Sequence, residues 1–409
     1  MDRDLIRGSF LVLGLTLALP AGSLRAQRAA EEAASVFDPA PVLQLKIELG
    51  EEARRQLEGN HKAFVRATVR EGEKVYAEVG LRLKGSAGSF RNIYDSKPGF
   101  TLKFNQFMPA GRFHGLKKLH LNNGAQDPTY LSELIGNEVF RAAGVPAQRV
   151  GHARIELNGR SLGLYMVIEA VTRDFLARWF TDTSGTYFEG PGEINSGSLD
   201  VDSEGGQPRP GGREALEALA EAAVEPDPAR RMERLEKLLD VDRFISFLCV
   251  EAITSHWDGY AIGVNNYHLY HEPKSGRFTF FPHGIDQLFQ QPHAPAVIQG
   301  NGLVARGVLG TAAGKARYRE RFKVLFENLF EVEAIQKRID EVTASLGPML
   351  RAIDPAQAEA QAQHARDLSS RIVERARNLR QQMGIRRQSL AFDQDGRARP
   401  TAWQPKDHI

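Results

Sequence analysis

The chain contains almost no cysteine, because Cys249 is the single one among 409 residues. An intrachain disulfide is therefore impossible. Apolar residues at positions 245, 248, 249 and 252 follow the spacing of one helix face, so Cys249 is predicted to be a small core residue. A catalytic thiol is the alternative interpretation of this position.

Four further features are missing, and each absence removes a class of protein. No segment after the N-terminal residues reaches about 18 consecutive apolar residues, so no further membrane span is expected. The formal net charge is only +2, which gives no electrostatic case for nucleic acid or an anionic membrane as a partner. The histidines show no paired metal-binding spacing and no Gly-x-Ser-x-Gly motif occurs, so neither a histidine-based zinc site nor an α/β-hydrolase is supported.

The N-terminus has the pattern of a secretory signal peptide. Arg3 and Arg7 supply positive charge, and residues 9–19 form an apolar run that is too short to span a bilayer. Ala21, Gly22 and Ala26 are the small residues that a signal peptidase needs near its cut, so we predict cleavage after Ala26. The mature protein is then expected to be secreted, periplasmic or part of a cell envelope, and an uncleaved N-terminal anchor is the alternative.

Strand patterns dominate the first 170 residues, and helical patterns dominate the remainder. This order predicts an α+β fold with a sheet-rich N-lobe, a helical C-lobe and a site between them. The predicted organisation is a signal peptide at 1–26, a leader at 27–40, the N-lobe at 41–188, a Gly/Pro-rich connector at 189–212, the C-lobe at 213–384 and a polar tail at 385–409.

Two local signals in the N-lobe are specific. Asn158-Gly159 lies between two alternating segments and predicts a tight hairpin. Asp127-Pro128 predicts the start of a helix, with the aspartate as its N-cap and the proline at its first position. Glu138 falls on the apolar stripe of that helix, and a carboxylate on a buried face needs a partner. A side chain that reaches the surface is the alternative.

The residues with the clearest chemical potential surround a predicted hairpin with strands at 267–270 and 278–281. Asp258, Asn265 and Asn266 precede the first strand, and Asp286 follows the second, so the hairpin brings their loops to neighbouring strand ends. Hard cations take carboxylate and amide oxygens as ligands. Phosphoryl transfer uses such a metal site together with a second aspartate that accepts the proton of the nucleophile. Alternatively, these residues cap turns and bond loop backbone.

The order of a His-x-Asp loop, an asparagine, two short strands and an aspartate matches protein kinases. Further short matches occur in order along residues 42–340. By these matches the chain resembles the spore coat protein H (CotH) kinase family. The segments that carry the resemblance are Leu81-Arg82-Leu83-Lys84-Gly85-Ser86, Lys97-Pro98-Gly99-Phe100, Leu119-His120-Leu121-Asn122-Asn123 with Asp127-Pro128, Ala143-Gly144-Val145-Pro146, Gly163-Leu164-Tyr165, His256-Trp257-Asp258-Gly259-Tyr260 with Asn265-Asn266, and Phe280-Phe281-Pro282 before Asp286.

The resemblance implies a minimal atypical protein-kinase-like fold that transfers phosphate from ATP to protein hydroxyls with Mg²⁺ or Mn²⁺. It implies that Asp258 is the catalytic-loop aspartate and that Asp286 is a metal ligand. Either Asn265 or Asn266 would be the second metal ligand.

The lysine that would hold the nucleotide phosphates is less clearly marked. Lys103 is the first choice because it stands on a strand after the glycine-containing loop, with Lys84 and Lys97 as rivals. Glu138 is the expected ion-pair partner of that lysine. The backbone amide at Gly85 is a further candidate for phosphate contact, and an ordinary turn is the alternative.

Two positions depart from the family pattern. Gly284 stands where relatives often have the first acidic residue of a Trp-Asp-x-Asp motif, and Glu189 stands where they often have lysine. The sequence therefore supports two hypotheses: an exported kinase acting on a protein substrate, or a catalytically degenerate kinase-like scaffold that binds a partner in a cell envelope, coat or extracellular matrix.

Overall fold

The computed structural model describes residues 32–37, 42–201 and 211–385. The predicted signal peptide at 1–26 lies outside the described residues, and so does the polar tail from residue 386 onward. Parts of the predicted leader and of the connector also lie outside them.

The first part of the described chain forms a closed barrel with the strand order β1-β2-β3-β4-β5-β7-β6. Neighbouring strands are antiparallel except β1 and β6, which are parallel and close the barrel. Closure leaves no free edge that could pair with another chain. The strands are β1 (Leu43–Glu48), β2 (Val65–Glu71), β3 (Lys74–Lys84), β4 (Gly99–Lys103), β5 (Lys118–Asn122), β6 (Val150–Leu157) and β7 (Arg160–Glu169), with helix α2 (Glu51–Gly59) against β2.

The expectation that strands dominate the first 170 residues is confirmed, because alternation places apolar residues inside the barrel. In β1 every second residue is buried, and most buried apolar residues of the barrel form one hydrophobic cluster. The predicted hairpin is also confirmed, since β6 and β7 pair across Asn158-Gly159. Both turn residues have positive φ, 49° and 80°, as the favoured two-residue turn requires. Strand β5 and helix α2 were not predicted.

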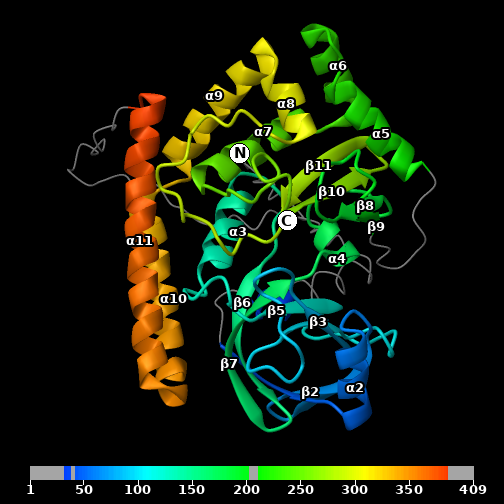
Figure 1. Ribbon diagram of the computed structural model, residues 1–409, viewed down its shortest axis with the longest axis vertical. Coiled ribbons are helices and arrows are strands. Elements are labelled where there is room, and N and C mark those ends of the chain that lie inside the picture. The colour runs from blue at the N-terminus through cyan, green and yellow to red at the C-terminus, as the bar shows by residue number, and fades with distance from the viewer. Residues whose placement is uncertain (1–31, 38–41, 202–210, 386–409) are drawn as a thin grey trace, which may run out of the picture.

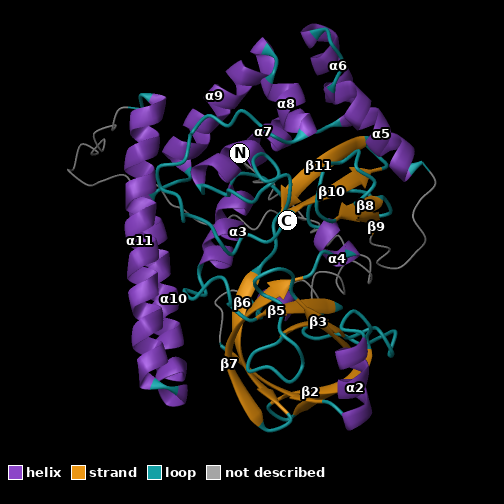
Figure 2. Cartoon of the chain, viewed as in Figure 1, coloured by secondary structure: helices purple, strands orange, loops and turns teal. Residues whose placement is uncertain are grey.

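The second part of the chain contains a sheet with the order β11-β10-β8-β9, surrounded by helices (Figures 1 and 2). The predicted hairpin is confirmed as β10 (Tyr267–Glu272) and β11 (Arg277–Pro282). The remaining elements are α4 (Arg173–Leu176), β8 (Thr186–Glu189), β9 (Asp200–Val201), α5 (Gly212–Ala223), α6 (Pro228–Leu238), α7 (Val241–Ile253), α8 (Leu303–Leu309) and α9 (Ala312–Asn328). Cys249 is buried in α7 and belongs to the core, as predicted.

Three helices connect the two parts. Helix α3 (Ser132–Ala142) follows β5 in the chain, yet its buried apolar residues belong to the C-terminal core. Helices α10 (Val332–Ile353) and α11 (Pro355–Met383) form a long hairpin along one side of the molecule (Figure 1). α10 contacts β7 of the barrel, and α11 contacts α7. The mixed α and β architecture expected from the sequence is therefore confirmed.

The predicted start of α3 is wrong by several residues. The helix begins at Ser132, not at Pro128. Asp127 accepts hydrogen bonds from the backbone amides of Thr129 and Ser132, so its carboxylate organises a turn that precedes the helix. No helix within the described ranges is long and apolar enough to cross a bilayer.

Candidate functional site

A cavity of about 520 Å³ lies where the outer face of the barrel meets the loops around β10 and β11. Strands β3, β4 and β5 supply one wall, and the loops that precede β10 and follow β11 supply part of the other. The cavity brings together six of the predicted site residues, which are Lys84, Gly85, Asp258, Asn265, Asn266 and Asp286. We call it the main cavity.

The predicted pair of Lys103 and Glu138 is wrong. Glu138 is buried as predicted, but Arg338 on α10 donates to its carboxylate at 2.9 and 3.1 Å. The ammonium of Lys103 instead lies 5.8 Å from the ring centre of Phe64. Lys103 shares a strand face with Thr101, which does line the main cavity, but the extra step along β4 carries the lysine beyond the cavity wall.

Lys84, which the sequence analysis gave as a rival of Lys103, lines the main cavity. Its ammonium donates to Oδ1 of Asn122 at 2.7 Å, and the Nδ2 atom of Asn122 donates to Glu133 at 2.6 Å. Lys84 stands opposite Gly99 on β4, so no side chain of that residue separates it from Asn122 on β5. The lysine is thus linked through an asparagine to a carboxylate on α3.

Glu133 and Asn122 are functional candidates that the sequence analysis missed. Glu133 is buried, and burial raises the pKa of its carboxyl to about 8, with the nearby charge of Asp286 acting in the same direction and Lys84 opposing it. A signal for Asn122 was present, since Lys118, His120 and Asn122 alternate with two leucines and therefore share one strand face. Helical periodicity placed Glu133 off the apolar stripe of α3, but residues 132–140 of that helix are all buried, so its carboxylate is enclosed as well.

Asp258 and Asp286 face the same cavity from different loops. The side-chain amides of Asn265 and Asn266 donate to Oδ2 of Asp258 at 3.2 and 2.7 Å. Burial raises the pKa of Asp286, and the positive charge of Lys84 opposes this shift. Among the described residues, no group of three or more His, Cys, Asp or Glu side chains could hold a metal ion. A hard cation here would need ligand oxygens beyond the two aspartates.

Glu251 on α7 forms hydrogen bonds to the backbone of the loop that carries Asp258. Glu251 is fully buried, and its carboxylate accepts the backbone amides of Tyr260 and Ala261 at 2.8 and 3.0 Å. A Cβ on Gly259 would lie 2.1 Å from Oε1 of Glu251, so only glycine permits this approach. These bonds fix the backbone just after Asp258, and Glu251 is accordingly a positioning residue.

The side chain of Asn266 leaves no room for a side chain at position 284. The φ of Gly284 is +53°, and an added Cβ would lie 2.4 Å from Oδ1 of Asn266. An aspartate at position 284, as in the family pattern, would require Asn266 to move. In this chain the amide of Asn266 fills the space beside position 284.

The barrel wall of the cavity is rich in groups that can carry positive charge. Arg82, Lys84, Lys118 and His120 reach it from β3 and β5. His268 and His283 lie nearby with ring centres 4.3 Å apart. Burial lowers the pKa of His283 to about 3 and lowers the pKa values of His120 and His268 well below their usual range, so these rings are neutral at pH 7. The permanent positive charge therefore comes from the arginine and the lysines.

Comparison with known proteins agrees with the motifs in the sequence. Residues 81–390 match the family described as CotH kinase protein. The chain is 25% identical over 293 residues to Invasin CotH2 of Rhizopus delemar, which covers 62% of this chain and 48% of that protein. It is 21% identical over 262 residues to Inner spore coat protein H of Bacillus subtilis, which covers 60% of this chain and 72% of that protein. The match thus spans about half the length of the Rhizopus relative.

Proposed function

Because the chain belongs to the CotH kinase protein family, we propose that it is a kinase-like phosphotransferase. In this proposal the barrel acts as the N-lobe and the helical part as the C-lobe. The main cavity binds ATP with Mg²⁺ or Mn²⁺, and the terminal phosphoryl group passes to a hydroxyl of a protein substrate.

The observation that carries the proposal is the separation of charge across the main cavity. Arg82, Lys84 and Lys118 line the barrel wall, and Asp258 and Asp286 approach from the loops around β10 and β11. A nucleoside triphosphate with a divalent cation needs both cationic and carboxylate side chains, because its phosphates are anionic and the metal prefers carboxylate oxygens. The link from Lys84 through Asn122 to Glu133 would hold the lysine in place against the phosphates.

Each residue then has a defined role. Asp286, with an oxygen of Asn265 or Asn266, would hold the cation, which would neutralise charge on the phosphates. Asp258 would accept the proton of the substrate hydroxyl. The oxygen of that hydroxyl would bond to the γ-phosphorus as the bond between this phosphorus and the oxygen of the β-phosphate breaks. Glu251 would fix the loop of Asp258. The amide near Gly85 would contact a phosphate oxygen.

The proposed setting is outside the cytoplasm, in a coat or a cell envelope. Its support is the predicted signal peptide together with the relatives named inner spore coat protein and invasin. A coat or envelope protein is accordingly the proposed substrate or partner. One observation favours the non-enzymatic alternative, a kinase-like binding scaffold: position 284 supplies no carboxylate, and its space is taken by Asn266.

Calorimetry with ATP and Mg²⁺ or Mn²⁺ tests the proposal. Asp286→Asn should abolish metal-dependent nucleotide binding, because it removes the charge that holds the cation. Asp258→Asn should leave binding largely intact but slow phosphoryl transfer, since a general base contributes roughly 10²–10⁴-fold to rate. A wild-type protein that binds no nucleotide with either metal would exclude the enzyme and leave the scaffold.

Two lysines provide a matched control for the same measurement. Lys84→Met should lose nucleotide binding, because it removes the ammonium that lines the main cavity. Lys103→Met removes the same charge from the same barrel at a position outside the cavity, and it should bind as the wild type does. Equal effects of the two substitutions would contradict the assignment of Lys84.

A further inference from the structure

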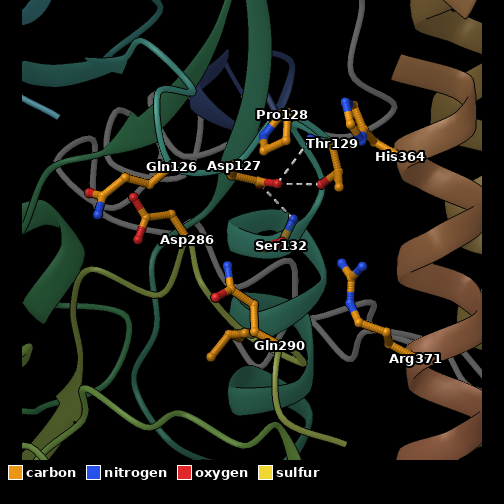
Figure 3. A pocket seen from close by; sticks show the side chains of 10 residues that line it. Gln126, Asp127, Pro128, Thr129, Ser132, Asp286, Gln290, His364 and Arg371 are labelled. Carbon is orange, nitrogen blue, oxygen red and sulfur yellow. Dashed lines mark hydrogen bonds between the residues drawn. The ribbon is translucent and has the colours of Figure 1, made fainter. Parts of the chain in front are cut away.

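A second, smaller cavity of about 250 Å³ adjoins the main cavity, and Figure 3 shows the side chains that line it. Asp286 and Gln126 line both cavities, so these two side chains form part of the wall between them. The remaining lining comes from the turn at 127–129, from Ser132 at the start of α3, from residues 288 and 290, and from His364 and Arg371 on α11. The roles proposed above for the main cavity do not involve α11.

Arg371 is the unusual group in this second cavity. Within the part of the chain that the structure describes, its buried Nε atom has no hydrogen-bond partner. Arg375, one turn later on the same helix face, makes the contrast clear. Arg375 is fully buried, and its guanidinium donates to the carbonyls of Ile253, Pro292 and Ala294, among others. Arg375 therefore anchors α11 against the core and directs Arg371 toward the cavity.

The carboxylates in the same cavity do not neutralise Arg371. Asp127 is turned into its own loop, where Thr129 and Ser132 donate to it (Figure 3). Asp286 lies on the opposite side of the cavity from Arg371 in Figure 3. Arg371 and His364 line the cavity from α11, whereas Figure 3 shows the amide of Gln290 on the side of Asp286.

We propose that the second cavity is a binding site for an oxyanion, either a phosphate or a carboxylate group, held by Arg371 with His364 as the second donor. The planar guanidinium offers paired N–H groups that match the oxygens of such an anion. The Nε atom of Arg371 is itself buried, which strengthens a hydrogen bond made there because water competes less for the donor. This site does not depend on phosphoryl transfer in the main cavity.

Titration of the full chain with inorganic phosphate, followed by calorimetry at constant ionic strength, tests the site. Arg371→Gln should weaken phosphate binding about tenfold or more, the usual effect of losing a charge-assisted hydrogen bond. Arg377→Gln, at an exposed position on the same helix, should bind as the wild type does. The same titration with acetate shows which group the site prefers. Acetate binding that is equal to or tighter than phosphate binding identifies a carboxylate site, and tighter phosphate binding identifies a phosphate site.

Lys84→Met separates this site from the main cavity. If phosphate binds in the second cavity, Lys84→Met should retain phosphate binding even though it loses nucleotide. Phosphate binding that disappears in Lys84→Met and persists in Arg371→Gln would overturn the proposal, and so would a wild type that binds neither anion. Should Arg371→Gln fold poorly, His364→Gln tests the same cavity and should also weaken phosphate binding.

Discussion

Gly284 is one of the two positions that depart from the family pattern, and its backbone and its neighbour both restrict substitution. We expect Gly284→Ala to destabilise the protein by more than about 1 kcal/mol, because a Cβ is disfavoured at positive φ. The added atom would also push Asn266 away from its bond with Asp258. Urea denaturation and nucleotide calorimetry measure the two effects.

Gly276 offers a matched control for this change. It lies in the turn between β10 and β11 with φ +66°, and an added Cβ would meet nothing within 4 Å. Gly276→Ala should therefore show the backbone cost alone and leave nucleotide binding unchanged. Equal stability and equal nucleotide binding of the two alanine variants would show that the position of Asn266 does not depend on glycine at position 284.

At the scale of elements, α3 carries a carboxylate whose ionisation opposes folding. The pKa of Glu133 is about 8 in the folded protein, against an ordinary value of 4.5. Between these pH values the folded state holds a proton that the unfolded state releases. The stability contributed by this protonated carboxyl is therefore complete below about pH 4.5 and is lost as the pH rises through about 8.

Glu133→Gln keeps the shape of the side chain and removes this titration. We expect the variant to gain stability relative to the wild type as the pH rises from about 4.5 to about 8, since only the wild type must ionise a buried group. Urea denaturation of both proteins across this range provides the comparison. Because other titrating groups are common to both proteins, parallel stability curves would show that Glu133 does not titrate in this window.

At the scale of the whole molecule, Arg375 ties α11 to the end of α7 and to the loop at 292–295. Burial lowers the pKa of its guanidinium to about 10, so the charge remains at neutral pH. Arg375→Met would leave several buried carbonyls without a hydrogen-bond donor. Each such carbonyl lowers the free energy of unfolding by about 1–3 kcal/mol. We expect a loss of about 3 kcal/mol or more in the free energy of unfolding, measured by chemical denaturation.

The exposed Arg377 on the same helix is again the matched control. Arg377→Met should change stability by less than about 0.5 kcal/mol, as is usual for surface positions. Similar losses in both variants would mean that the effect comes from helix propensity or net charge and not from the buried contacts of Arg375.

The sequence by itself determined much of the secondary structure. It also determined those residues of the main cavity that lie next to a predicted hairpin or in a recognisable motif. Periodicity predicted strands in the first 170 residues and helices in the remainder, because alternation and helical spacing express which face a segment buries. Asn158-Gly159 predicted its hairpin, since the turn needs positive φ at both residues. The predicted hairpin at β10 and β11 likewise brought Asp258 and Asp286 to one cavity.

Only the tertiary structure decided which side chains meet across long stretches of chain. Closure of the barrel depends on pairing between β1 and β6, more than a hundred residues apart, and no local pattern specifies it. Periodicity correctly buried Glu138, but its partner Arg338 lies 200 residues away. Strand alternation gave Lys103 the correct face without showing how far the cavity extends. Lys84 was already a candidate from the sequence, but the packing of β3, β5 and α3 decided that Lys84 lines the cavity and is linked to Glu133. Local forces fix the direction of a side chain, whereas its partner is fixed by the packing of distant segments.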